Sequence, residues 1–163
     1  MLTTCAECGR EQSEHDRHVR FMLPDPVAAR EIDIGSSGFW MSHDTPRESV
    51  FMAVDGLGSF LRSLLPVRLT GGYVVTFGVW IGVPHEEMLR AFEVWNAASY
   101  VDLALNGLLA NSLPIWGLLG SRVHLEVSDL NQTPYCTSSS DDELSSVLTE
   151  VWPHERVLSE LPA

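Results

Sequence analysis

Residues 73–83 read YVVTFGVWIGV. Apolar side chains recur at every second position, and alternation over this length predicts a β-strand with one face in the core. The expected core face carries Tyr73, Val75, Phe77, Val79, Ile81 and Val83. On the other face Trp80 stands between Gly78 and Gly82, which leave room for its ring or for another chain to approach closely.

Two further strands are expected before this segment, over residues 49–54 and 59–69. Asp55-Gly56 predicts the turn between them, and Gly71-Gly72 predicts the hairpin turn into residues 73–83. Pro66 lacks a backbone N–H, so we expect it at a sheet edge or a bulge. Consecutive strands joined by tight turns predict antiparallel pairing.

Helices are expected in the second half of the chain. The spacing of Met88, Phe92 and Trp95 predicts a helix over residues 85–97, whereas residues 100–110 fit either a strand or a helix. Further along we expect strands over residues 122–127 and 133–136, and a closing helix over residues 141–151 that Trp152-Pro153 ends. The sequence therefore predicts an α+β fold, a mainly antiparallel sheet with helices packed on one face.

The length of 163 residues predicts one domain. Within it, residues 1–20 form a candidate metal knuckle and residues 21–48 an irregular arm with a short helical piece over residues 27–32. Residues 49–163 form the α+β core.

The net charge of the chain limits the kinds of binding partner that we expect. The net charge is −12, the ten basic residues are all arginines, and they are scattered along the chain. Such a surface repels a phosphate backbone, so nucleic acid is not expected as a partner. An acidic surface suits a basic protein partner through electrostatic steering, or it serves only to keep the protein soluble.

No segment reaches the roughly 20 consecutive apolar residues of a membrane span. The first residues lack the basic-then-apolar order of a signal peptide, because Cys5, Glu7 and Cys8 interrupt it. We therefore expect a cytoplasmic protein.

Cys5-Ala6-Glu7-Cys8-Gly9 is half of a metal site. Two cysteines in this spacing can bind one zinc ion, but a structural zinc site needs four ligands. His15, His18 and Cys136 are the candidates to complete it. The alternative interpretation is a pair of free thiols.

A second candidate site combines Arg62 and His124, with Trp80, in a cleft that faces the sheet. An arginine and a histidine together can bind an anion, although each can equally be a structural residue of its strand. No nucleophile elbow, phosphate-binding loop or metalloprotease motif occurs in the sequence, so catalytic residues are not assigned.

The Cys5–Gly9 motif, the Asp55-Gly56 turn and two longer runs together resemble the bacterial domain of unknown function 2199 family. The more specific runs are Thr76-Phe77-Gly78-Val79-Trp80-Ile81 and Arg122-Val123-His124-Leu125. The resemblance covers nearly the whole chain and implies a small cytoplasmic bacterial protein, with no activity attached. Where the family pattern has an early histidine after the cysteines, this chain has Arg10, Glu11 and Gln12.

Two functions follow as expectations. The first is a non-enzymatic, acidic protein-binding module, stapled by zinc if the knuckle is complete. The alternative is a small enzyme or ligand-binding protein that uses Arg62 and His124.

Overall fold

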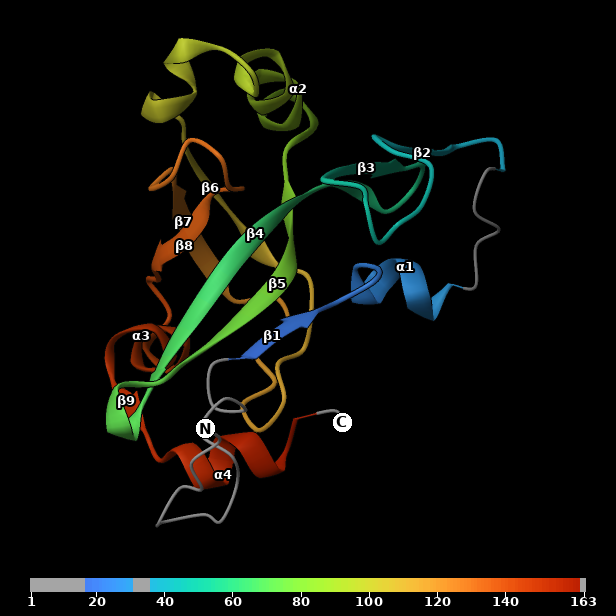
Figure 1. Cartoon of the computed structure of the whole chain (residues 1–163). Helices are drawn as coiled ribbons and strands as arrows, with labels where there is room; N and C mark the ends of the chain where they lie inside the picture. Colours follow the sequence, from blue (N-terminus) through green and yellow to red (C-terminus); the bar gives the residue numbers. More distant parts are fainter. Residues whose placement is uncertain (1–16, 31–35, 162–163) are drawn as a thin grey trace, which may run out of the picture.

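The fold is described from a computed structural model, which covers residues 17–30 and 36–161. Figure 1 shows a long diagonal pair of strands, β4 and β5, with β6, β7 and β8 on one side and β2, β3 and α1 on the other. In chain order the elements are β1 (Arg17–Arg20), α1 (Asp25–Ala29), β2 (Phe39–Met41), β3 (Phe51–Val54), β4 (Gly58–Leu69), a 3-10 turn (Thr70–Gly72), β5 (Val74–Val83), α2 (His85–Val94), a 3-10 helix (Ala98–Asp102), β6 (Ala104–Leu109), β7 (Arg122–Glu126), β8 (Tyr135–Ser138), α3 (Asp142–Thr149), β9 (Val151–Trp152) and α4 (His154–Ser159).

The hairpin of β4 and β5 is the centre of the fold. The strands pair antiparallel over their whole length, from Ser59 opposite Val83 to Arg68 opposite Val74. The turn between them contains Gly71 and Gly72, which adopt positive φ angles of 84° and 81°. Glycine takes this conformation without steric cost. The predicted strands, their connection and their antiparallel pairing are confirmed.

Five strands close into a ring. In the described part of the chain β5, β6, β7, β8 and β4 follow one another, and β4 pairs back with β5. Four of the contacts are antiparallel, while β8 meets β4 in parallel, with Tyr135 opposite Leu64. A closed ring with an odd number of strands cannot alternate direction throughout, so one contact must be parallel. The predicted antiparallel sheet is therefore a small mixed barrel.

Short strands extend the sheet beyond this barrel. β1 pairs in parallel with β5, from Arg17 opposite Val75 to Arg20 opposite Gly78. Along the outer edge of β4, β3 pairs antiparallel at its start, whereas β9 pairs in parallel at Arg68 and Leu69. Pro66 lies between the β8 contact at Leu64 and the β9 contact, where no partner needs its N–H. The edge position expected for Pro66 is consistent with this arrangement.

Two apolar clusters hold the sheet. The main one contains the predicted face of β5 together with buried residues of α2, α3 and α4. A second cluster, on the other face of the β4–β5 hairpin, gathers Phe60 and Trp80 with Val27 of α1. The helices therefore do not all pack on one face. The expectation was wrong for α1, because the face that carries Trp80 is apolar enough to need a cover of its own.

The structure corrects several predicted boundaries. Residues 104–109 of the ambiguous segment form strand β6, preceded by a 3-10 helix. The closing helix predicted over residues 141–151 ends at Thr149 and is not the last element, because β9 pairs with β4 and α4 follows. The short helix of the arm occupies Asp25–Ala29, and the rest of its predicted range lies outside the described residues. Cys5 and Cys8 of the expected knuckle also lie outside the described residues. Among the described residues, no helix is long and apolar enough to cross a membrane.

Candidate functional site

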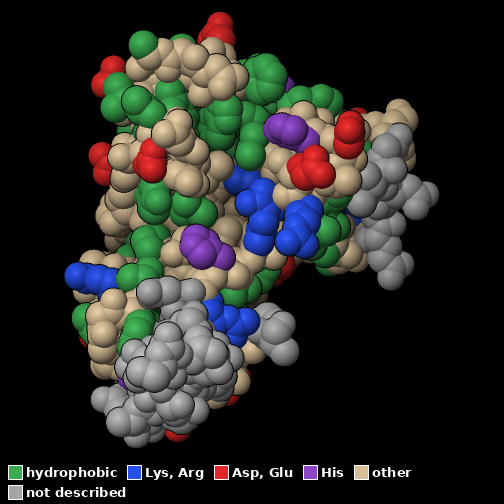
Figure 2. All heavy atoms as spheres, viewed as in Figure 1, with side chains coloured by type: hydrophobic (Ala, Val, Ile, Leu, Met, Phe, Trp, Pro, Cys, Tyr) green, Lys and Arg blue, Asp and Glu red, His purple; other side chains and the backbone are tan. Residues whose placement is uncertain are grey.

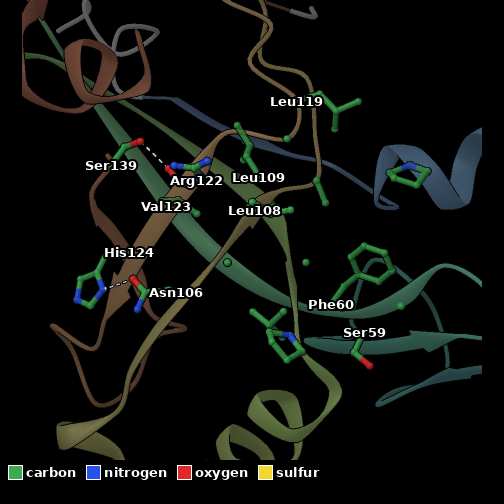
Figure 3. Close-up of a pocket in the computed structure, with 18 of the residues that line it drawn as sticks. Ser59, Phe60, Asn106, Leu108, Leu109, Leu119, Arg122, Val123, His124 and Ser139 are labelled. Carbon is green, nitrogen blue, oxygen red and sulfur yellow. Dashed lines mark hydrogen bonds between the residues drawn. The ribbon is translucent and has the colours of Figure 1, made fainter. Parts of the chain in front are cut away.

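An open groove of about 1170 Å³ lies on the outside of the barrel. Its base is the outer face of β6 and β7, and its opposite side comes from the start of β4, the end of β5 and Pro26 of α1. In Figure 3, Asn106, Leu108, Arg122 and His124 lie along the two paired strands, and Phe60 faces them from the other side.

Strand register places the base residues side by side. Asn106 is opposite His124, and Leu108 is opposite Arg122. Because side chains alternate along a strand, these four point outward while Leu105, Leu109, Val123 and Leu125 fill the core. The groove is therefore a consequence of two amphipathic strands whose polar face is not covered by a helix.

The base is partly apolar and partly polar. Leu108, on the outer face of β6, is 50% exposed. Beside it, His124 Nδ1 lies 2.8 Å from Asn106 Oδ1, and His124 Nε2 lies 3.9 Å from Glu126 Oε2. These contacts fix the histidine ring along the strand.

The charge of the groove is opposite to that of the protein. The chain has 22 acidic residues, yet the groove-lining residues among positions 17–30 and 36–161 include Arg122 and His124 and not one aspartate or glutamate. Within the described residues, the Arg122 guanidinium has no hydrogen bond or ion pair, since Asp141 accepts only from the Arg122 backbone N–H. Arg122 is thus available to an anionic group of a ligand.

A bulge and a loop with unusual backbone angles flank the groove. Thr137 is the extra residue where β7 and β8 slip register, and its hydroxyl donates to Glu126 Oε2. In the loop that leads to Leu119 and Gly120, Ile115 and Leu118 have φ angles of 74° and 73°. Positive φ is unfavourable for branched side chains, and such strain concentrates at functional sites.

Ser59 and His85 form the contact that most resembles a catalytic pair. Ser59 Oγ lies 2.8 Å from His85 Nδ1. Ser59 and Phe60 both line the groove, but they point to opposite faces of β4, and the Ser59 hydroxyl is turned away from Phe60 (Figure 3). The Ser59 hydroxyl is therefore directed at His85 and not at Phe60 across the groove.

Arg62 is a structural hub. It is 1% exposed, and its guanidinium donates to five backbone carbonyls while it stacks on Trp80 at 4.2 Å. The carbonyls belong to Phe21, Met22, Pro46, Ser49 and Gly78. Every donor direction of the guanidinium is occupied within the protein, which leaves none for a ligand.

Other arginines lie close to Arg62. Burial, and after it the charge of Arg20, lowers the pKa of Arg62 to about 9, and burial with Arg47 lowers the pKa of Arg20. Figure 2 shows arginine side chains gathered near the middle of the face of the molecule that is turned to the viewer. At neutral pH these groups stay charged, so the hub is a cation held by carbonyl dipoles.

The structure does not bring Arg62 and His124 together. His124 lines the groove, whereas neither Arg62 nor Trp80 belongs to its lining. Trp80 is fully buried, and its indole N–H donates to the carbonyl of Met22 at 3.2 Å. The glycines beside it leave room for neighbours, because Arg20 lies against Gly78 and the Phe60 ring against Gly82.

Of the candidate zinc ligands, Cys5, Cys8 and His15 lie outside the described residues. His18 is on the exposed face of β1, and Cys136 is in the main core, where burial raises the pKa of its thiol to about 12. Metal binding requires the thiolate, so this environment disfavours Cys136 as a ligand. Among residues 17–30 and 36–161, no three histidine, cysteine, aspartate or glutamate side chains form a metal-binding group. Zinc binding stays a prediction.

The sequence profile of one family matches residues 4–148, from before β1 into α3. The family is described as an uncharacterized protein conserved in bacteria, DUF2199. The chain belongs to this family. The resemblance seen in the sequence is thereby confirmed, and the match includes every strand of the barrel and the whole groove. Neither the curated proteins nor the solved structures contain a match to the chain.

Sequence reasoning found one residue of the groove, His124, and missed Asn106, Leu108 and Arg122. Arg122 and His124 alternate with Val123 and Leu125, which indicated their shared outer face. Asn106 and Leu108 fall in the segment that was ambiguous between strand and helix. Their positions opposite His124 and Arg122 are known only from the strand register of β6 and β7 in the structure.

Proposed function

We propose that the protein is a binding module whose groove takes an extended, apolar segment of a protein partner that carries a carboxylate. The observation that supports this most directly is the lining of the groove. An exposed leucine and an unpaired arginine lie side by side there, and none of the described residues that line the groove carries a carboxylate, although the chain is strongly acidic.

The size of the groove favours a peptide segment over a small molecule. Pockets for small ligands typically enclose about 300–1,000 Å³. A groove of about 1170 Å³ that is open to solvent exceeds this range and suits a stretch of extended chain. Its apolar walls would contact side chains, while Arg122 recognises the carboxylate.

Binding is favoured over catalysis because the polar groups of the groove are suited to recognition. The His124 ring is held by Asn106, and the Ser59 hydroxyl is directed to His85 on the other face of its strand. Charge-assisted hydrogen bonds from an arginine give both affinity and orientation.

The proposal is tested with a short labelled peptide of alternating leucine and serine, made once as the free acid and once as the C-terminal amide. Fluorescence anisotropy should show the acid binding roughly tenfold more tightly than the amide, the value of one charge-assisted hydrogen bond. In Arg122→Gln this difference should disappear, because the guanidinium that distinguishes the two peptides is gone.

Leucine substitutions inside and outside the groove test whether binding depends on the groove or on any exposed leucine. Leu108→Asp should abolish binding of both peptides, whereas Leu130→Asp should leave it unchanged. Leu130 is 61% exposed but does not line the groove, so it controls for loss of an exposed leucine. Equal binding of acid and amide by the wild type, or an equal loss in both variants, would refute the proposal.

A further inference from the structure

A second, smaller cavity of about 240 Å³ lies between α3, β9 and the loop before β7. It is lined by Trp116, Leu118, Glu143, Ser146, Glu150 and Trp152. The liquid volume of a water molecule is about 30 Å³, so the space suits the end of one side chain rather than a whole small molecule.

The two tryptophans form an aromatic corner. Their ring centroids are 5.2 Å apart and their planes meet at 72°. Both indole nitrogens are buried without an acceptor among the described residues. Since these nitrogens are inaccessible, the ring carbons of Trp116 and Trp152 are what face the cavity. The electron-rich face of an indole is the best side-chain partner for a cation.

One face of α3 adds negative charge to this corner. Glu143, Ser146 and Glu150 follow one another at spacings of three and four residues, which places them on the same side of the helix. In the part of the chain that the structure describes, neither glutamate takes part in a salt bridge. Glu150 also caps the C-terminal end of α3, where the helix dipole favours a cation.

One cation, Arg68, lies near this site. Arg68 donates a hydrogen bond to the carbonyl of Thr149 at the end of α3. No salt bridge joins it to Glu150 within residues 17–30 and 36–161. The cavity therefore combines two aromatic rings, two free carboxylates and a volume for one side-chain end, and the lining residues that the structure describes include no cation.

We infer that this cavity binds an alkylammonium group, the charged end of a lysine side chain, presented by a basic protein partner. Aromatic faces and carboxylates attract the same charge, and the net charge of −12 steers such a partner to the surface. The site is separate from the groove, which has the opposite charge preference. It draws Glu150 and Trp152 from beyond the residues that match the family.

Isothermal titration calorimetry tests the inference with a lysine whose α-amino and α-carboxyl groups are both blocked, so that only the side-chain ammonium is charged. Norleucine blocked in the same way is the neutral analogue of nearly the same shape. The wild-type protein should bind the lysine compound and show no measurable heat with norleucine. The double variant Glu143→Gln, Glu150→Gln should bind lysine roughly tenfold more weakly, as the loss of two attractive charges predicts. Both glutamates are exposed, so this variant should fold normally.

Two further measurements complete the test. Glu93→Gln removes one exposed carboxylate from α2 and should leave binding unchanged, which controls for the loss of a negative charge away from the cavity. Tetramethylammonium, added as a competitor, should displace the lysine compound because the aromatic corner recognises the onium group itself. Binding of norleucine as tight as that of lysine, failure of tetramethylammonium to compete, or the same loss in Glu93→Gln would overturn the inference.

Discussion

Arg62 shows how one residue joins segments that are distant in the sequence. Its side chain leaves β4, crosses Trp80 and reaches the carbonyls that follow β1 and those that precede β3. A buried guanidinium without these acceptors would be strongly unfavourable, so the two loops and the arginine stabilise each other. The hub fixes how the N-terminal strand is attached to the barrel.

Arg62→Lys should lower the free energy of unfolding by about 2–3 kcal/mol. An ammonium has three donors on one atom and cannot replace a planar guanidinium that reaches five carbonyls, so several buried acceptors lose their partner. Urea denaturation followed by circular dichroism measures the change. Arg68→Lys on the same strand is the matched control and should stay within about 0.5 kcal/mol, because Arg68 is exposed. Equal effects of the two exchanges would show that Arg62 is not a hub.

Sequence alone could place Arg62 on the strand predicted over residues 59–69, but it could not decide between a ligand site and a hub. Both roles use an arginine on a partly apolar strand. What separates them is the set of carbonyls around the guanidinium, and these come from loops whose path no periodicity specifies. The same limit applied to Cys136, whose burial depends on the contact of β8 with β4.

At the scale of elements, Gly107 determines how β6 can cross β5. A Cβ atom at this position would lie 2.6 Å from the carbonyl oxygen of Gly82 and 2.6 Å from Ile81 Cγ2. Both distances are well below van der Waals contact. Gly107 is thus the point where the strand needs a residue without a side chain.

Gly107→Ala should destabilise the protein by about 2–3 kcal/mol, because β6 must move away from β5 to admit the methyl group. Gly82→Ala, on the strand that β6 crosses, should cost less than about 1 kcal/mol, since its Cβ would meet its nearest neighbours at 3.7 Å. Thermal unfolding of both variants measures the two losses of stability and compares them. A smaller loss for Gly107→Ala than for Gly82→Ala would contradict the crossing geometry.

Alternation predicted β4, β5 and β7 well because each has one apolar face over many residues. It failed for β6, where the outward Leu108 and the inward Gly107 break the pattern. It also failed for β9, a strand of two residues that exists only because β4 offers it an edge. Elements that depend on a partner strand leave little trace in local sequence.

At the scale of the whole molecule, a narrow seam between β8 and β4 closes the barrel. The backbone N–H of Leu64 and the hydroxyl of Ser63 both donate to the carbonyl of Pro134, at 2.9 Å and 2.8 Å. Directly inside this seam, the Cys136 thiol lies 3.4 Å from the Ser63 hydroxyl. Closure could not be read from the sequence, since the two strands are far apart in it and meet in parallel.

The thiol in this seam makes stability depend on pH. Cys136 is 3% exposed, and burial raises its pKa from an ordinary value of 9.0 to about 12, although the contact with Ser63 lowers it slightly. Between these two values the unfolded chain loses the proton and the folded protein keeps it. The contribution of Cys136 to stability is therefore complete below pH 9, and it decreases as the pH rises toward 12.

Urea titrations of the wild type and Cys136→Ala, at several pH values from 7 to 10.5, measure this contribution. At pH 7 the variant should be less stable by about 1–2 kcal/mol, because it leaves a small cavity in the core. By pH 10.5 the wild type should have lost about 2 kcal/mol relative to the variant, at about 1.4 kcal/mol for each pH unit above 9. The two stabilities should then be equal or reversed. Cys5, Cys8 and Tyr100 are present in both proteins, so their ionisation cancels in the difference. Stability curves that stay parallel to pH 10.5 would mean that the thiol ionises as easily in the folded protein as in the unfolded chain, and that the seam is open to solvent.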